Sequence, residues 1–174
     1  MSIQFRTSEG EATALGRVLL AWWQRLIEED RASRAILRRA SSPTLVAFSA
    51  PYQRLYRRLL AAGWPADARP QQNERLAGIV GLLAHIKRNE PGLIASAMSR
   101  PGEGSDRPPV SELRFLRLLD APDGEALYTG LRRVLPLMNH QIDVLALADD
   151  FLYWGDAVKK RWAYSYHWPD KAPS

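Results

Sequence analysis

The stretch from Ser111 to Arg133, SELRFLRLLDAPDGEALYTGLRR, contains two short amphipathic segments joined by a polar turn. In the first segment, Leu113, Leu116 and Leu119 recur every three residues, which places them on one face of a helix. Apolar residues form a second stripe after the turn: Leu127, Leu131, Val134, Leu135 and Met138. The stretch therefore predicts two consecutive helices that each bury one side.

Each of these two segments also carries a pair of arginines. Arg114 and Arg117 are three residues apart, so they share a face that we expect to point outward. Arg132 and Arg133 flank the second stripe where it approaches solvent. Arginine without lysine beside buried leucine indicates an anionic partner, because the planar guanidinium matches the forked geometry of phosphate or carboxylate.

Elsewhere the chain shows helical periodicity and no sustained alternation of apolar and polar residues. The fold is therefore predicted to be all-α, with about seven to nine helices arranged as two small packed bundles. Residues 1–99 are assigned to an N-terminal bundle and residues 110–174 to a C-terminal bundle. Residues 100–109, RPGEGSDRPP, are assigned to a linker loop because they contain three prolines and two glycines.

Two of the expected helices are long. Residues 71–88 are predicted as one helix with Lys87 and Arg88 at its C-terminal end, where the helix dipole favours cations. Residues 142–168 are predicted as a single helix whose broad apolar coverage makes it the spine of the second bundle.

The charge of the chain is basic and dominated by arginine. The net charge is +5, and of the 24 basic residues four are lysine and the other 20 arginine. A phosphate-rich partner would account for this bias, and so would a GC-rich genome. Residues 31–66 contain seven arginines and no Asp or Glu, an unbalanced charge that favours a polyanion-binding surface.

Several classes of protein are disfavoured by the sequence. No run of about 18 apolar residues is present, and the N-terminus lacks the pattern of a signal peptide, so we expect a cytoplasmic protein without a membrane partner. The absence of cysteine excludes disulfides and thiolate metal sites. His85, His140 and His167 lie in separate segments, so we expect no metal. No Walker loop and no nucleophile-elbow setting is present, so we also expect no cofactor and no catalysis.

One region of the chain is acidic. Between Val134 and Val158 there is no Lys or Arg, while four aspartates are present: Asp143, Asp149, Asp150 and Asp156. Because an acidic face would repel nucleic acid, we assign it to a protein partner or to solvent.

Taken in order, these elements resemble the CasB family, the small subunit of the type I-E CRISPR surveillance complex Cascade. The resemblance rests on the following pieces: Trp22, ILRRASSP at 36–43, Gly63-Trp64, SELRFLRLL at 111–119, LRR at 131–133, Asp143, Trp154-Gly155 and RWAYSY at 161–166. Their order and spacing, over about residues 15–166, make the match specific.

The resemblance implies an all-helical subunit present in two copies beside the subunits that hold the CRISPR RNA and the large subunit. It also implies a basic surface that holds target DNA while the R-loop forms, without catalysis. In such complexes the guide RNA reads the sequence, so the small subunit needs only to bind backbone.

The resemblance also implies nucleic-acid contacts at particular basic residues. The candidates are Arg38, Arg39, Arg69, Lys87, Arg88, Arg114, Arg132, Arg133, Lys159 and Lys160. Arg117 joins them as the companion of Arg114 on the same face. Arg132 and Arg133 could equally brace the helical bundle.

Two other functions compete with this hypothesis. A helical adaptor could bind acidic proteins through the same arginine faces. A sequence-specific helix-turn-helix regulator is disfavoured, because residues 111–119 show mainly Arg and Leu rather than the mixture of Asn, Gln, Ser and Arg typical of a recognition helix.

Overall fold

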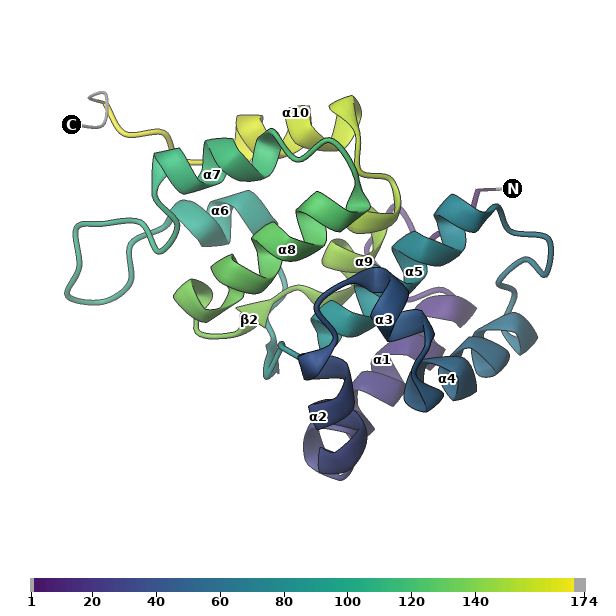
Figure 1. Cartoon of the computed structure of the whole chain (residues 1–174). Helices are drawn as coiled ribbons and strands as arrows, with labels where there is room; N and C mark the ends of the chain where they lie inside the picture. Colours follow the sequence, from purple (N-terminus) through teal and green to yellow (C-terminus); the bar gives the residue numbers. More distant parts are fainter. Residues whose placement is uncertain (1, 171–174) are drawn as a thin grey trace.

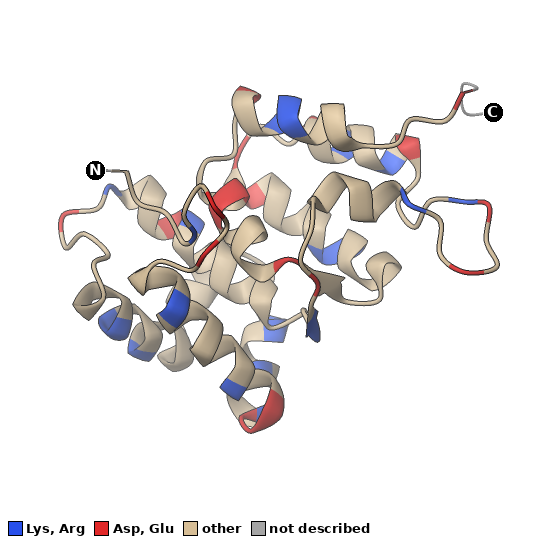
Figure 2. Ribbon diagram, turned by 180° about the vertical axis from the view of Figure 1, so that it is seen from behind, with Lys and Arg blue, Asp and Glu red and all other residues tan. Residues whose placement is uncertain are grey.

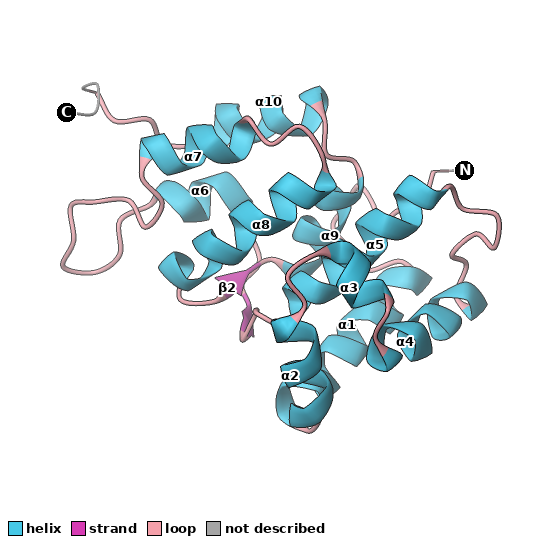
Figure 3. Ribbon diagram, in the orientation of Figure 1, coloured by secondary structure: helices cyan, strands magenta, loops and turns pink. Residues whose placement is uncertain are grey.

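The structure is a computed structural model that describes residues 2–170. Within this part the chain forms ten α-helices, one 3-10 helix and two very short strands (Figures 1 and 3). In chain order they are α1 (Ala14–Glu28), α2 (Arg31–Arg39), α3 (Pro43–Ala47), α4 (Ala50–Ala61), α5 (Pro70–Leu83), β1 (Arg88–Asn89), α6 (Ile94–Ser99), α7 (Glu112–Leu119), α8 (Gly124–Val134), η1 (Leu135–Met138), β2 (Gln141–Ile142), α9 (Val144–Leu152) and α10 (Asp156–Ser165). The predicted all-α class is confirmed.

Polar side chains set the starts of most helices. In each case a Ser, Thr or Asp oxygen accepts a hydrogen bond from a backbone N–H in the first turn, which would otherwise lack a partner. These N-cap residues are Thr13, Asp30, Ser42, Ser49, Ser111, Asp123 and Asp143. Because such caps are local in sequence, the chain divides into short helices at the same points where its sequence offers them.

Helix α5 is the centre of the core. All residues from Leu76 to Leu83 are buried, and the helix packs against α3, α8 and α9 (Figure 1). Gly78 allows the close approach of α9, because a Cβ there would lie 2.7 Å from the ring of Phe151. Burial therefore extends around most of this part of the helix rather than along one face.

The halves of the chain are joined by several such contacts. Besides α5, α1 packs against α9 and α6 packs against α10. Residues 101–109 form an exposed, non-helical loop that extends from the body of the molecule (Figure 1). The division into bundles at residues 1–99 and 110–174 stays a prediction, and residues 171–174 lie outside the described part. None of the described helices combines the length and apolar character that a membrane crossing requires.

The number of helices exceeds the prediction because the segment 142–168 is not one helix. It is interrupted after Leu152, and α10 starts only at Asp156. Trp154, in the interruption, is buried and donates its indole N–H to the carbonyl of Ala121 at 2.9 Å. The break therefore places Trp154 against the turn that contains Ala121 and against Trp162 of α10, with 5.0 Å between the ring centroids.

The apolar face of α7 also differs from the prediction. Leu113 and Leu116 are 52% and 41% exposed, whereas Phe115 and Leu118 are buried. Phe115 stacks on the ring of Tyr166 with a centroid distance of 4.1 Å, so a distant aromatic partner selects the face of α7 that turns inward. By contrast, the stripe predicted for α8 and η1 is buried throughout, as its five residues show: Leu127, Leu131, Val134, Leu135 and Met138.

The segment 71–88 ends its helix earlier than expected. Helix α5 stops at Leu83, so Lys87 and Arg88 do not occupy a helix C-terminus, and the prediction for them is wrong. Instead, Arg88 begins β1, which pairs in parallel with β2. The backbone N–H of Lys87 donates to the carbonyl of His140 at 2.8 Å. A two-residue ladder has no periodicity to detect, since it depends on pairing between segments about 50 residues apart.

Candidate nucleic-acid interface

The basic candidates lie at four places on the molecule rather than on one continuous face. Figure 2 shows Lys and Arg on helices at opposite ends of the fold, with acidic residues between them. The four places are a groove between α7 and α8, the end of α2 with the neighbouring β1, helix α10, and the start of α5. The surroundings of each side chain decide which of them can bind a ligand.

The groove between α7 and α8 gathers three of the candidates. Arg114 and Arg117 from α7 and Arg133 from α8 line a hollow of about 410 Å³. All three side chains are exposed, and no Asp or Glu is among the lining residues. Three guanidinium groups without a local carboxylate make this groove a site of positive potential that suits a chain of phosphates.

The packing of α7 against α8 shapes the groove and directs its arginines outward. Ser111 caps α7 by accepting the N–H of Arg114, and the buried Phe115 and Leu118 turn the intervening arginines outward. Gly130 lets α8 approach α7 closely, because a Cβ there would lie 2.8 Å from Leu118. Arg114 and Arg117 are about 4.5 Å apart along the helix axis, so both side chains leave the same stretch of α7.

Arg132, next to Arg133 on α8, points to a different side of the helix. One of its amino groups, Nη2, donates to the carbonyl of Arg38 at 3.1 Å, and its guanidinium lies 5.6 Å from the centroid of the Tyr128 ring. The Tyr128 hydroxyl donates to the carbonyl of Ala40 at 2.7 Å. Arg132 therefore connects α8 to the end of α2, as the bracing alternative predicted, while Arg133 faces the groove.

Arg38 and Arg39 end α2, and both are exposed. Lys87 and Arg88, at the start of the small sheet, are also exposed. Sequence reasoning did not select Arg34, which donates its Nε–H to the carbonyl of Ala84 at 3.1 Å and so ties α2 to the turn after α5. The spacing of Arg34 and Arg38, one helical turn apart, was the signal that could have identified it.

The arginines of α4 are partly compensated. Arg54 and Arg58 line a groove of about 420 Å³ that also contains Glu29 and Asp30. The charges of Arg54 and Arg58 are therefore met by carboxylates that precede residues 31–66 in the chain.

On α10, the two lysine candidates differ. Lys159 is half-buried, and its ammonium group lies 5.6 Å from the centroid of the Trp154 ring, which commits it to a cation–π contact. Lys160 is exposed and lines a groove of about 470 Å³ together with Tyr164, whose side chain is 91% exposed. Sequence reasoning missed Tyr164, an aromatic surface of the kind on which single-stranded bases stack.

Arg69 stands apart at the start of α5. Its backbone N–H donates to the side chain of Gln72 at 3.0 Å, while its own side chain is exposed. The two pockets lined by the first turns of α5 contain none of the other candidate residues.

The acidic residues near α9 do not form a face for a partner, so that prediction is wrong for three of them. Asp143 and Asp149 pair with Arg6 at 3.9 and 3.6 Å. The buried Asp150 accepts hydrogen bonds from Arg161 and from the indole of Trp162, each at 2.8 Å. These carboxylates connect segments of the same chain, whereas Asp156 is exposed.

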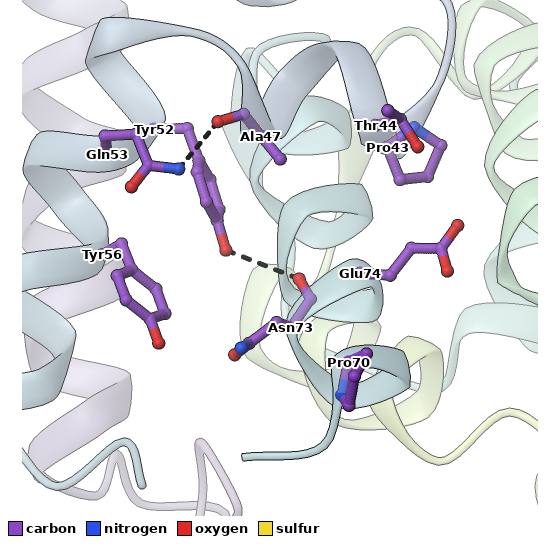
Figure 4. Close-up of a pocket in the computed structure, with 9 residues that line it drawn as sticks. All are labelled: Pro43, Thr44, Ala47, Tyr52, Gln53, Tyr56, Pro70, Asn73 and Glu74. Atoms are coloured by element: carbon purple, nitrogen blue, oxygen red, sulfur yellow. Dashed lines mark hydrogen bonds between the residues drawn. The ribbon is translucent and has the colours of Figure 1, made fainter. Parts of the chain in front are cut away.

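A further pocket lies between α3, α4 and α5 (Figure 4). Tyr52 and Asn73 face each other across it, with the Tyr52 hydroxyl 3.5 Å from the Asn73 carbonyl. No Lys or Arg lines this pocket, so it does not belong to the basic surface. Among residues 2–170, no three His, Asp or Glu side chains are grouped as metal ligands would be.

Comparisons with known proteins show which family and fold the chain shares. A family model described as CRISPR-associated protein Cse2 matches residues 33–167. A chain from the crystal structure of E. coli Cascade bound to a PAM-containing dsDNA target is similar, with a TM-score of 0.64 and 21% identity over 84% of this chain and 92% of that chain. CasB from Thermus thermophilus has a TM-score of 0.63 and 27% identity over 89% of this chain and 98% of its own. No curated protein sequence matches.

Proposed function

The chain belongs to the family of CRISPR-associated protein Cse2, and from this premise we propose that it is a non-catalytic small subunit of a type I-E CRISPR surveillance complex. In this role it binds the backbone of nucleic acid without reading sequence and stabilises the R-loop during antiviral defence. Its partners are the subunits that hold the CRISPR RNA, the large subunit, a second copy of itself, and the CRISPR RNA and target DNA.

The groove between α7 and α8 is the observation that carries this proposal. Arg114, Arg117 and Arg133 share one hollow without a carboxylate, which leaves their charge available to a ligand. A guanidinium can hold a phosphate through two parallel hydrogen bonds, and such contacts give affinity without base preference. The exposed leucines of α7 do not offer the polar groups needed to read base edges.

The comparisons support the assembly part of the proposal. The E. coli relative is a chain of a Cascade structure that contains a dsDNA target, and its fold is shared over most of both chains. In such a complex guide pairing supplies the sequence specificity, so this subunit needs only to bind the nucleic-acid backbone.

Binding of labelled single-stranded and duplex DNA at several salt concentrations tests the proposal. Three phosphate contacts predict that the logarithm of the association constant falls by about 2 to 3 per tenfold rise in salt. The double variant Arg114→Glu/Arg117→Glu should weaken binding about 30-fold or more at low salt and flatten this slope. The matched control is Arg100→Glu/Arg107→Glu, in the exposed loop, which changes the net charge equally.

Equal losses in both double variants would show that only net charge matters and would contradict a site in the groove. The wild-type chain should also co-purify with the guide-RNA subunits in a complex that survives high salt. Failure to assemble with them would overturn the proposed role altogether.

The adaptor hypothesis keeps one specific observation in its favour. Leu113 and Leu116 are exposed beside the groove arginines, and an apolar pair with flanking cations suits an acidic protein surface. Nuclease treatment of the purified complex separates the two functions, since a protein contact through α7 would persist after the nucleic acid is digested.

A further inference from the structure

A second gathering of cations lies where the end of α2 meets the last turn of α8 and the turn that follows α5. Arg34 reaches this turn through its hydrogen bond to the carbonyl of Ala84, and Arg132 reaches α2 through the carbonyl of Arg38. On the other side, Nδ1 of His140 lies 2.9 Å from the carbonyl of His85. Segments about 50 and 90 residues apart are thus fixed around His85.

Three nitrogen atoms at this junction are buried without a hydrogen-bond partner in the described part of the chain. They are Nη2 of Arg34, Nε of Arg132 and Nε2 of His85. Each guanidinium makes its other hydrogen bond to a backbone carbonyl, so its orientation is fixed. Leaving buried polar groups unpaired costs about 1 to 3 kcal/mol each, which makes their coincidence at one place informative.

The junction also lacks a compensating negative charge. The segments that supply its side chains, residues 31–66, 75–89 and 127–142, contain no Asp or Glu. Neither Arg34 nor Arg132 takes part in an ion pair with a described residue. Two oriented guanidinium groups held together without a carboxylate form a site that an anion would stabilise.

His85 is adapted to this environment. Burial, together with the charges of Arg132, Arg38, His140 and Arg34, lowers the pKa of His85 to about 4. Its imidazole is therefore neutral at pH 7 and can donate a hydrogen bond without adding to the repulsion among the arginines. Arg38, whose charge also acts on His85, is exposed, so the junction lies close to the molecular surface.

We propose that Arg34, Arg132 and His85 form a binding site for one phosphate group. A phosphate offers several strong acceptor oxygens in different directions, which matches donors that come from three separate segments. The site is distinct from the α7–α8 groove, because Arg132 and Arg133 leave α8 on different sides. That the phosphate is supplied by a nucleic-acid backbone rests on the proposed function, whereas the site itself does not.

Titration of the His85 imidazole by NMR in the isolated protein tests the site. Inorganic phosphate is compared with sodium chloride at equal ionic strength. A bound anion favours the protonated imidazolium, so phosphate should raise the pKa of His85 towards its ordinary value. An identical His85 titration in phosphate and in chloride would overturn the proposal and leave the junction filled by water alone.

Variants locate the effect and separate it from the proposed function. Arg34→Gln should weaken phosphate binding about tenfold or more, because it removes a charge-assisted hydrogen bond, while Arg57→Gln on the exposed face of α4 should not. Loss of the His85 response in both variants would contradict the site.

A DNA oligonucleotide used in place of phosphate identifies the source of the phosphate. If the site exists and the proposed function fails, inorganic phosphate still shifts His85 and the oligonucleotide does not. If the groove alone binds DNA, the oligonucleotide binds the wild type but does not shift His85, and that outcome contradicts a backbone phosphate at this junction.

Discussion

The basic residues of α7 and those near α9 and α10 have opposite surroundings. Arg114 and Arg117 line an exposed groove without a carboxylate. Arg161 instead lies 2.8 Å from the buried Asp150, and Arg6 pairs with Asp143 and Asp149. In the sequence all four are arginines of a basic chain, yet only the first pair is available to a ligand, because the charge of the second pair is used to hold the chain together.

This difference follows from the elements that lie between the charges. Near α9, the N-terminal segment and α10 both pack beside the aspartates, so Arg6 finds acidic partners far away in the sequence and Arg161 finds one on the preceding helix. Beside α7, the neighbouring helix α8 contributes another arginine. Net charge therefore indicates the class of partner, while tertiary contacts decide which cations serve it.

The largest expected effect on stability comes from removing the buried carboxylate of Asp150. Asp150→Ala removes the acceptor of both Arg161 and the buried indole of Trp162, and we expect the free energy of unfolding to fall by about 3 kcal/mol. Urea denaturation followed by circular dichroism measures it. Asp156→Ala, at an exposed position of the same region, should change stability by about 0.5 kcal/mol or less. Equal stability of the two variants would show that the buried pair contributes nothing.

A smaller effect is expected at the junction around His85, where the stability of the protein should depend on pH. The unfolded chain protonates His85 near its ordinary pKa of 6.5, whereas the folded protein does so only near 4, so stability is lost as the pH falls between these values. After allowance for solvent screening, we expect His85 to account for about 1 kcal/mol of the loss between pH 7.5 and pH 5. Denaturation of His85→Gln at both pH values should show a correspondingly smaller loss. The exposed His167→Gln is the control, and equal losses in all three proteins would rule out this contribution.

The smallest effect distinguishes two adjacent lysines. Lys159→Ala loses the contact with Trp154 and should cost about 0.5 to 1 kcal/mol of stability, with little change in the salt dependence of DNA binding. Lys160→Ala should leave the melting temperature unchanged and reduce the slope of the salt dependence by about 0.7 to 0.9 if Lys160 contacts a phosphate. Thermal unfolding and DNA titration of both variants measure the difference. If Lys159→Ala changed DNA binding and Lys160→Ala changed stability, the assignment of Lys159 to a structural contact and of Lys160 to a ligand would be wrong.

Much of the fold could be predicted because its signals are local. Caps such as Ser111 and Asp123, the turn at residues 120–124 and the stripe of α8 lie within a few residues of the structure that they specify. The break between α9 and α10 could not be predicted in this way. It serves the burial of Trp154 against Ala121, which is 33 residues distant.

The part of the candidate site that lies within one helix could be predicted, and the part that depends on contacts between helices could not. Spacing alone placed Arg114 beside Arg117, because positions three apart share a helix face. It could not show that Arg133 would join them while Arg132 would bind the carbonyl of Arg38, 94 residues away. The same limit applies to Arg34 and His85, whose proximity depends on the packing of α2 against the end of α5.

The sequence by itself determined that this is an arginine-rich, all-helical chain without cysteine, and its motifs indicated the family that residues 33–167 confirm. Only the tertiary structure decided which face of α7 is buried and which basic residues have carboxylate partners. The physical reason is that helical periodicity fixes the spacing of side chains within one segment. Burial and ion pairing depend instead on surfaces contributed by segments far apart in the chain, such as Tyr166 against Phe115 and Asp149 against the N-terminal backbone.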